Sequence, residues 1–463
     1  MQRTRPDTLR AAIAASGGVS PQFAVGPSSS ASWSELADGS VLDCHATELS
    51  GLTVVLAAID SFAAATAMIQ MDGIVRRMVL YPPDLSREHL DFVAKTAEAD
   101  VIVTDRQISV KVEARVVYIE PGDGRDKFET GPQTSPLATE WILLTSGTTG
   151  RPKLVQHNLA SLIADIEFQR ASYAPVVWST FYDIRRYGGL HIFLDALCTG
   201  ASMVISNGDE PLGDFLSRAG KNGVTNISGT PSHWRRALMS SWAGHIAPKY
   251  VRLSGEIADQ AILNSLRSQY PHARIGHTFA STEAGVAFSV KDELMGFPSE
   301  ILNHNQDVDM KVVDSTLRVR SERTASRYLG ADSPALRDAD GFVDTGDALE
   351  LRNGRYYLVG RRDGIVNVGG FKIHPEEVEA VINRHPAVAM SLVKAKKNPI
   401  TGALVIADIV INDGHRSEDV DALQRDILHH CRGELAAYKV PATLRFVSSL
   451  AVSTSGKMVR HNA

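Results

Sequence analysis

The chain has 463 residues, of which 44% are hydrophobic and 22% charged, and a formal net charge of −5 at pH 7. This length exceeds what one compact core holds and predicts two or three globular domains. The small negative charge gives no reason to expect a nucleic acid or an anionic membrane as a partner. Cys44, Cys198 and Cys431 are far apart and odd in number. They argue against a disulfide framework or a cysteine metal site and favour a reducing cytoplasm.

No segment reads as an export signal or a membrane span. The N-terminus carries two arginines with no apolar stretch behind them, which is unlike a signal peptide. The most apolar segment, residues 52–71, is interrupted by Asp60, Ser61 and Gln70. We therefore expect a packed core helix there.

Hydrophobic periodicity predicts strands that alternate with helices, which is typical of a doubly wound α/β sheet. Residues 1–45 are weakly patterned. Ser86 is expected to cap a helix, and Asn158 to open another after a polar turn that follows Lys153. The expected helices are 51–70, 86–97, 159–166, 191–198 and 258–268, and the expected strands are 78–81, 101–104, 141–144, 176–180, 201–205, 251–254 and 274–280.

The pattern changes twice in the second half of the chain. From about residue 305 short β segments predict a β-rich subdomain. After Gly360 a small α+β domain is expected. Its elements are a helix over 375–385, a hairpin of 388–394 with 403–410, a helix over 417–434 and a terminal strand.

A run of glycine and hydroxyl residues ends the strand that starts at Trp141, and Lys153 follows it. Such a loop offers backbone N–H groups and hydroxyls to a polyphosphate, and the lysine adds a point charge. The spacing is not that of a P-loop, because Arg-Pro follows the last glycine. The alternative is a flexible surface turn. The run consists of Thr145, Ser146, Gly147, Thr148, Thr149 and Gly150.

The segment from Thr145 to Lys153 resembles the signature loop of the adenylate-forming superfamily, which comprises acyl-CoA synthetases, luciferases and peptide-synthetase adenylation domains. Five further stretches resemble that family in the same order. The resemblance covers most of the chain and is weakest over about the first fifty residues. It implies an N-terminal adenylation domain over 1–361 and a mobile C-terminal lid domain over 362–463, with a hinge at Asp363.

Thr282 and Glu283 form the second of these stretches. A carboxylate there can hold Mg²⁺ that bridges phosphate oxygens, and the hydroxyl can donate to the α-phosphate. The resemblance gives the pair these roles and implies that Phe279 stacks on adenine; the family usually has Tyr-Gly where this chain has Phe-Ala. A helix-capping threonine beside a solvated glutamate is the alternative. The neighbouring residues expected to bind nucleotide are Gly255, Glu256, Phe279, Ala280 and Ser281.

Asp347 ends a Thr-Gly-Asp turn, where a fixed carboxylate can accept two hydrogen bonds from a ribose diol. The resemblance assigns Asp347 that role and makes Arg361 a second ribose-binding residue. Alone, the turn is a common one. Further on, Gly369 and Gly370 allow the chain of a second substrate to pass close to the backbone.

Lys457 stands on a glycine-hinged turn near the end of the sequence, where it can swing onto a phosphate. The resemblance implies that it stabilises the charge that develops during adenylation. A solvated tail lysine is the alternative.

One stretch departs from the family. Acyl- and aryl-CoA synthetases usually have an aromatic-histidine pair before the glycine that corresponds to Gly188, and Arg185 falls at the histidine position. The charges here lie near the expected acyl pocket or face solvent. We expect Arg185 to pair with a polar or acidic group on a short or aromatic acid. The expected pocket residues are Tyr182, Asp183, Arg185, Tyr187 and Gly188.

The sequence thus predicts an ATP- and Mg²⁺-dependent enzyme that activates a small carboxylic acid as an acyl-adenylate and transfers it to coenzyme A. One alternative transfers the acyl group to a carrier-protein phosphopantetheine or to an amine. Another is a non-catalytic relative that binds a nucleotide or a partner. The presence of Glu283, Asp347, Arg361 and Lys457 argues against the non-catalytic alternative.

Overall fold

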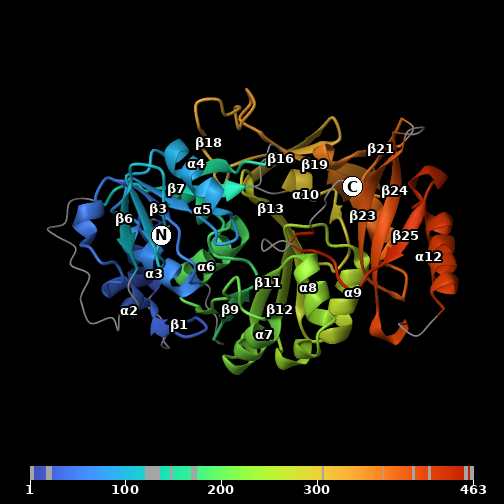
Figure 1. Cartoon of the computed structure of the whole chain (residues 1–463), viewed down its shortest axis with the longest axis horizontal. Coiled ribbons are helices and arrows are strands. Elements are labelled where there is room, and N and C mark those ends of the chain that lie inside the picture. Colours follow the sequence, from blue (N-terminus) through green and yellow to red (C-terminus); the bar gives the residue numbers. More distant parts are fainter. Residues whose placement is uncertain are drawn as a thin grey trace.

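The structure, a computed structural model, describes residues 5–16, 23–119, 136–145, 150–167, 175–304, 307–368, 370–398, 402–415, 419–452 and 457–458. Figure 1 shows two α/β layers, a β-rich subdomain above them and a small C-terminal domain at the far end of the long axis. The fold class expected from the sequence is confirmed.

The first α/β layer is a sheet of strand order β18-β8-β7-β4-β3-β5-β6. Strands β7, β4, β3, β5 and β6 run parallel to one another. At one edge β8 pairs antiparallel with β7, and β18 pairs antiparallel with β8. Its strands are β3 Thr53–Leu56, β4 Arg77–Leu80, β5 Val101–Thr104, β6 Arg115–Tyr118, β7 Glu140–Thr145, β8 Lys153–Asn158 and β18 Arg327–Leu329, and its helices are α3 Ser61–Met71, α4 Arg87–Ala97 and α5 Leu159–Leu162.

Three expectations for this layer are wrong. Residues 53–56, expected at the start of a helix, form the buried strand β3, because Thr53, Val54 and Val55 are β-branched and favour a strand. The helix begins only after Asp60, whose side chain accepts the Ala63 N–H. The expected turn after Lys153 is strand β8, and the helix expected over 159–166 ends at Leu162.

The second α/β layer has the strand order β14-β13-β12-β11-β9-β10-β1-β2, with antiparallel strands at its two edges. The N-terminal residues, weakly patterned in sequence, contribute two helices, the edge strand β2 and its neighbour β1. Its strands are β1 Phe23–Val25, β2 Ser30–Ser32, β9 Val177–Thr180, β10 Ser202–Val204, β11 Asn226–Gly229, β12 Tyr250–Ser254, β13 Arg274–Ser281 and β14 Gly285–Val290, and its helices are α1 Leu9–Ser16, α2 Trp33–Asp38, η1 Ala46–Leu49, α6 Tyr187–Thr199, α7 Leu212–Lys221, α8 Pro231–Leu238, η2 Ser241–His245 and α9 Gln260–Gln269.

Helices α3 and α6 lie between the two sheets and share one apolar core with both of them, in which Met68 and Phe193 are fully buried. Helices α7, α8 and α9 cover the other face of the second sheet. Both faces of each sheet are therefore covered, as a doubly wound fold requires. Among the described residues, no helix is long and apolar enough to cross a membrane.

The β-rich subdomain is a sheet of order β15-β20-β19-β17-β16, and the small domain has a separate apolar core. The subdomain consists of β15 Phe297–Pro298, α10 Ile301–His304, β16 Val308–Val313, β17 Thr316–Ser321, β19 Val343–Arg352 and β20 Arg355–Arg361. After η3 Arg362–Gly364, the small domain consists of β21 Val366–Val368, β22 Phe371–Ile373, α11 Pro375–Ile382, β23 Val388–Asn398, β24 Gly402–Ile411, η4 Asp413–His415, α12 Val420–Glu434, η5 Ala437–Lys439 and β25 Thr443–Phe446.

Candidate active site

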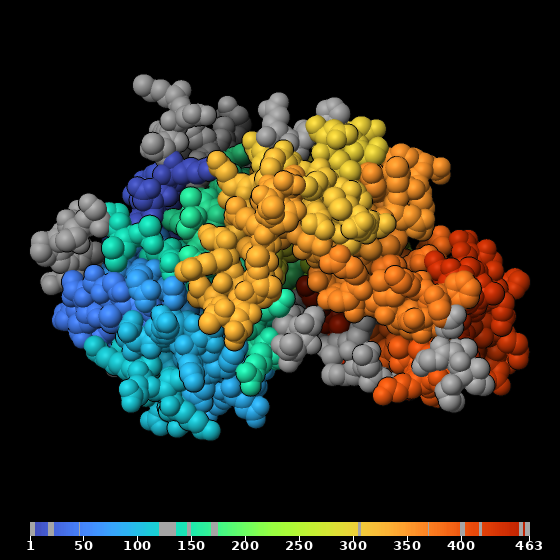
Figure 2. Space-filling view, turned by 90° about the horizontal axis from the view of Figure 1, so that it is seen from above, coloured from blue at the N-terminus to red at the C-terminus, as the bar shows by residue number. Residues whose placement is uncertain are grey.

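The end of the chain returns to the carboxyl end of strand β12, where the large domain and the small domain meet. Lys457 lies so close to Gly255 that a Cβ atom added to this glycine would stand 3.9 Å from the lysine Cε. Gly255 has a φ of +81°, a conformation that glycine adopts without strain. In Figure 2 the darkest red atoms, which belong to the last described residues, lie in the middle of the molecule.

Glu256 holds this segment in place. One of its carboxylate oxygens accepts the backbone N–H of Met458 at 3.0 Å, and the other accepts that of Ser232 at 2.9 Å, in the first turn of α8. We expected Glu256 to bind nucleotide. Two backbone donors from separate parts of the chain occupy its carboxylate, one on each oxygen, and a nucleotide-binding role for Glu256 stays a prediction.

Asp347 and Arg361 stand opposite each other on the paired strands β19 and β20, with 3.9 Å between guanidinium and carboxylate. Arg361 also contacts Asp363 at 3.0 Å and donates to the Thr345 carbonyl at 3.2 Å. Burial raises the pKa of Asp347 to about 6, against the pull of the nearby charges of Arg361 and Lys457. Residues that are distant in sequence thus form one partly buried charged cluster.

Thr282 and Glu283 occupy the turn between β13 and β14. The Thr282 carbonyl accepts a hydrogen bond from His157 Nε2 at 2.7 Å, and Glu283 accepts one from the Tyr328 hydroxyl at 3.2 Å. Burial lowers the pKa of His157 to about 4, so this imidazole is neutral at pH 7. Sequence reasoning missed both His157 and Tyr328, because their partners come from another sheet.

Lys153 joins the same group, because its ammonium lies 5.2 Å from the centroid of the Tyr328 ring. The hydroxyl of Thr145, at the end of β7, is buried and has no hydrogen-bond partner among the described residues. Gly150 has a φ of +80°. The other expected phosphate-loop residues, Ser146, Gly147, Thr148 and Thr149, lie outside the described residues, as does Gly369.

The remaining expected nucleotide-binding residues lie near this group or on the small domain. Phe279 stacks one face on Phe288, with ring centroids 5.5 Å apart and planes 11° apart. A bulge separates Phe279 from Ala280, and Ser281 accepts the Ala284 N–H at 3.0 Å. Gly370 is exposed in the β21–β22 turn, with a φ of +91°.

Beside Gly255 a narrow cavity of about 10 Å³, the space of one water molecule, opens between β12, β13 and α6. Three of the five expected pocket residues line it. The Tyr182 hydroxyl donates to the Ser254 carbonyl at 2.5 Å. The lining residues are Tyr182, Tyr187, Gly188, His191, Ser228, Arg252, Ser254, Ala280 and Val286.

The other two expected pocket residues, Asp183 and Arg185, form an ion pair in the protein interior. Arg185 is fully buried and contacts the Asp183 carboxylate at 2.7 Å through Nε and at 2.5 Å through Nη2. Its remaining donors reach the carbonyls of Ala58 and Ile59 and the hydroxyl of Ser61. The expectation that Arg185 meets either the substrate or solvent is therefore wrong.

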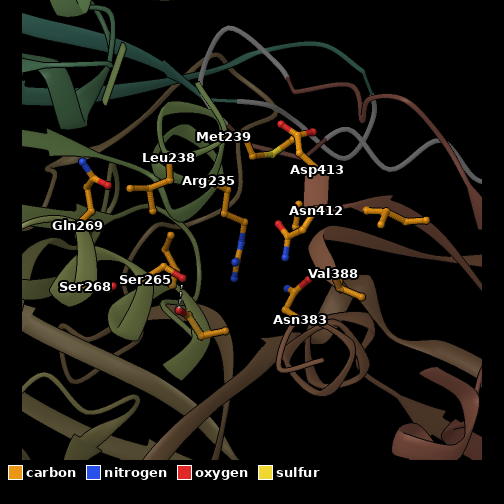
Figure 3. A pocket seen from close by; sticks show the side chains of 14 residues that line it. Arg235, Leu238, Met239, Ser265, Ser268, Gln269, Asn383, Val388, Asn412 and Asp413 are labelled. Carbon is orange, nitrogen blue, oxygen red and sulfur yellow. Dashed lines mark hydrogen bonds between the residues drawn. The ribbon is translucent and has the colours of Figure 1, made fainter. Parts of the chain in front are cut away.

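A second cavity lies in the groove between the large and small domains, away from this site. Figure 3 shows Arg235 of α8 and Met239, the residue after this helix, facing Asn383, Asn412 and Asp413 of the small domain across it. Asn383, which lines this cavity, donates to Asp259 at 3.2 Å, a hydrogen bond that joins the two domains.

A metal would have few protein ligands here. The described part of the chain contains no cluster of three or more His, Cys, Asp or Glu side chains that could hold a metal ion. Mg²⁺ in nucleotide sites usually needs only one or two carboxylates besides the phosphates. Glu283, which accepts the Tyr328 hydroxyl on one carboxylate oxygen, fits that donor set with its other oxygen.

Comparison with protein families decides the family. Residues 50–324 match the AMP-binding enzyme family, and residues 377–457 match the AMP-binding enzyme C-terminal domain. The chain belongs to the AMP-binding enzyme family. Mouse mitochondrial acyl-coenzyme A synthetase ACSM5 is 25% identical over 346 residues, which are 69% of this chain and 59% of the relative. Human ACSM1 is 34% identical over 149 residues, 31% of this chain and 26% of the relative. The chain thus spans about three fifths of the length of ACSM5.

Solved structures of this enzyme family share the fold over nearly the whole chain. The anthranilate CoA ligase AuaEII in complex with anthranoyl-AMP has a TM-score of 0.80 at 17% identity, covering 97% of this chain and 95% of that one. ATP-bound MatB from Rhodopseudomonas palustris has a TM-score of 0.77 at 21% identity, covering 98% and 97%. The amide bond synthetase McbA from Marinactinospora thermotolerans has a TM-score of 0.76 at 18% identity, covering 97% and 98%.

Proposed function

We propose that this chain is an AMP-forming acid–thiol ligase that acts in two half-reactions. In the first, a carboxylate oxygen attacks the α-phosphorus of ATP, the bond to pyrophosphate breaks, and an acyl-adenylate forms. In the second, the thiol of coenzyme A attacks the acyl carbonyl and AMP leaves. The observation that carries the proposal is the position of Lys457 against Gly255, close enough to Asp347 to act on its charge.

The proposed nucleotide site uses charge and fixed donors rather than covalent chemistry, as phosphoryl transfer requires. The triphosphate lies along Lys153 and the buried Thr145 hydroxyl, with the loop between them. Asp347 and Arg361 bind the ribose, and Phe279 stacks on adenine. Thr282 donates to the α-phosphate, and Lys457 meets the charge that develops there.

The site fits a bound magnesium ion with Glu283 as its protein ligand. When bound, Mg²⁺ neutralises charge on the phosphate oxygens. The Tyr328 hydroxyl donates to Oε1 of this carboxylate at 3.2 Å, which leaves Oε2 for the ion. His157 fixes the adjacent Thr282 carbonyl at 2.7 Å.

We propose further that residues 1–361 form the adenylation domain and that 362–463 form a lid that turns about Asp363. In the orientation of this structure, Lys457 lies against Gly255, which suits adenylation. After rotation, Gly369 and Gly370 would line the path of the thiol. The three free cysteines, two of them buried, support a reducing cytoplasm as the place of action.

The test is to incubate the protein with ATP and a panel of carboxylic acids, with and without coenzyme A, and to separate the nucleotides. The proposal expects acid-dependent AMP and pyrophosphate, with an acyl-CoA only when the thiol is present. If the acyl group of the adenylate passes only to a carrier protein or to an amine, the proposed first half-reaction stands and the proposed acceptor, coenzyme A, is wrong. ADP and phosphate, or no acid-dependent product, would contradict the proposal.

A further inference from the structure

Arg252 is the one guanidinium among the described residues that line the cavity beside Gly255. It lies on β12, two residues before Ser254, and faces helix α6 together with that residue. Sequence reasoning did not single it out, because an arginine at an alternate position of a strand is typical of a solvated face. In the structure it is partly buried instead.

The guanidinium has spare hydrogen-bond donors. Arg252 Nη1 lies 3.4 Å from His191 Nδ1. Its Nε is buried and has no hydrogen-bond partner within the part of the chain that the structure describes. A guanidinium carries five N–H donors, and leaving a buried one unpaired is costly. A ligand in the cavity that offers acceptor oxygens would satisfy these donors.

His191 and Asp165 orient Arg252 and leave other N–H donors of its guanidinium for a ligand. His191 Nε2 lies 2.9 Å from Asp165. Burial disfavours the charge of Asp165, but His191, Arg323 and Arg252 outweigh it and lower its pKa to about 2. The anionic Asp165 accepts the Nε2 N–H of His191, and Nδ1 of the same ring faces Arg252 Nη1. Arg185, by contrast, binds its carboxylate directly at 2.5 Å.

The distance along β12 limits what can lie between the two ends of the cavity. Two residues of a strand span about 7 Å, which separates Arg252 from Ser254. The reacting carboxylate belongs near Gly255 and Lys457, at the outer end. A carboxylate at the inner end would then be a few carbon atoms away, and the side chains that line this narrow cavity have to move apart to admit the acid.

Resting on the function proposed above, we propose that the acid activated by this protein is a short dicarboxylic acid. Arg252 binds the carboxylate that does not react, and the Asp165–His191 pair positions Arg252. Guanidinium and carboxylate make two parallel charge-assisted hydrogen bonds, which fix the length and the orientation of the substrate. A monocarboxylic acid of the same length would leave the guanidinium unpaired and bind more weakly.

The test measures pyrophosphate release with matched acids that differ only in the far end: succinate against butyrate, and glutarate against pentanoate. The wild-type protein should show a kcat/KM at least tenfold higher for the dicarboxylic member of one pair. Arg252→Ala should lower that value by roughly 10–100-fold, the size expected for a lost charge-assisted hydrogen bond, and change the monocarboxylic value less than about threefold. Arg252→Lys keeps the positive charge but cannot make two parallel hydrogen bonds. Its kcat/KM for the dicarboxylic acid should therefore fall between those of the wild-type protein and Arg252→Ala.

The matched control is Arg274→Ala, because Arg274 is exposed at the opposite end of the neighbouring strand and stands over the Tyr250 ring. It should affect both acids alike. Equal loss for both members of a pair in Arg252→Ala, or a wild-type preference for the monocarboxylic acids, would overturn the inference. Turnover of the monocarboxylic acid also reports whether each variant is folded.

A binding experiment separates this inference from the proposed function. In the presence of a non-hydrolysable ATP analogue, succinate or glutarate should raise the melting temperature of the wild-type protein and of Arg274→Ala, but not that of Arg252→Ala. If no acid releases pyrophosphate and this shift is seen, the reaction is wrong and the dicarboxylate site stands. If pyrophosphate is released and no such shift occurs, the site is wrong and the reaction stands.

Discussion

Glu256 and Met458 are joined by a hydrogen bond of 3.0 Å across 202 residues of sequence. The bond places the residue next to Lys457 on the large domain, at the start of helix α8. In the proposed mechanism the small domain leaves this position before the thiol enters, so that mechanism assigns the bond to the first half-reaction alone.

Replacing Glu256 by glutamine tests this assignment. The amide offers one acceptor where two backbone N–H groups need one each, so either Ser232 or Met458 loses its partner. We expect acyl-adenylate formation to slow by about tenfold, the equivalent of one hydrogen bond. Acyl-CoA formation from supplied adenylate should stay within about twofold. The control Glu322→Gln removes an exposed glutamate that pairs with Arg5. Equal slowing of both half-reactions by Glu256→Gln would disprove the assignment.

The raised pKa of Asp347, about 6, gives a pH dependence to nucleotide binding. A ribose diol needs the ionised carboxylate as a double acceptor, so protonation weakens binding. We expect the KM for ATP to rise as the pH falls through about 6, and the dependence to vanish in Asp347→Asn. The protonation of ATP itself affects the wild-type protein and Asp347→Asn alike, so the difference between their two pH profiles of the KM for ATP reports Asp347. A wild-type profile that runs parallel to that of Asp347→Asn would show that Asp347 does not bind the ribose.

The sequence allowed the α/β layers, the β-rich subdomain and the small domain to be predicted, because each follows from local periodicity. The helix expected over 51–70 was wrong where β-branched residues begin a buried strand, which apolar content alone does not reveal. Helices α1 and α2 were not predicted either, because their local sequence has little pattern and their apolar residues are buried only by packing with α3 and α6.

The site could be proposed from the sequence where a short motif carries the chemistry, as at Thr282, Glu283 and Asp347, whose roles stay predictions. It was not predictable where the environment comes from distant segments. The partners of Arg185 lie up to 127 residues away. The surroundings of Arg252 come from Asp165 and His191, on other elements. A charged residue in a sequence shows its charge but not its partner.

The buried pair of Arg185 and Asp183 should contribute to stability and not to specificity. Arg185→Met leaves the Asp183 carboxylate buried without its cation, which should cost about 3–5 kcal/mol of unfolding free energy. The double variant Arg185→Met/Asp183→Asn should recover part of it. Denaturant titration measures both. The ratio of dicarboxylic to monocarboxylic turnover should be unchanged in the single variant. A loss of turnover for one of the two acids alone would show that Arg185 contacts the acyl substrate.

Asp363→Pro tests whether the small domain has to turn. Asp363 lies inside the short helix η3, where the fixed φ of proline near −65° is compatible with the present orientation. We expect adenylate to form while acyl-CoA production falls by at least tenfold. Asp363→Ala is the matched control, because it removes the contact with Arg361 but leaves the backbone free. Normal acyl-CoA production by the proline variant would exclude rotation at this residue.

The measurement that tests the account most directly is a comparison of the two half-reactions in Lys457→Ala. If Lys457 stabilises charge only in the first transition state, the variant should lose about 10²–10³-fold in adenylate formation, which acid-dependent pyrophosphate release without coenzyme A reports. Supplied with synthetic acyl-adenylate, it should form acyl-CoA at close to the wild-type rate. Lys396→Ala, at an exposed position of the same domain, serves as control. Equal loss in both half-reactions, or none in the first, would contradict the account.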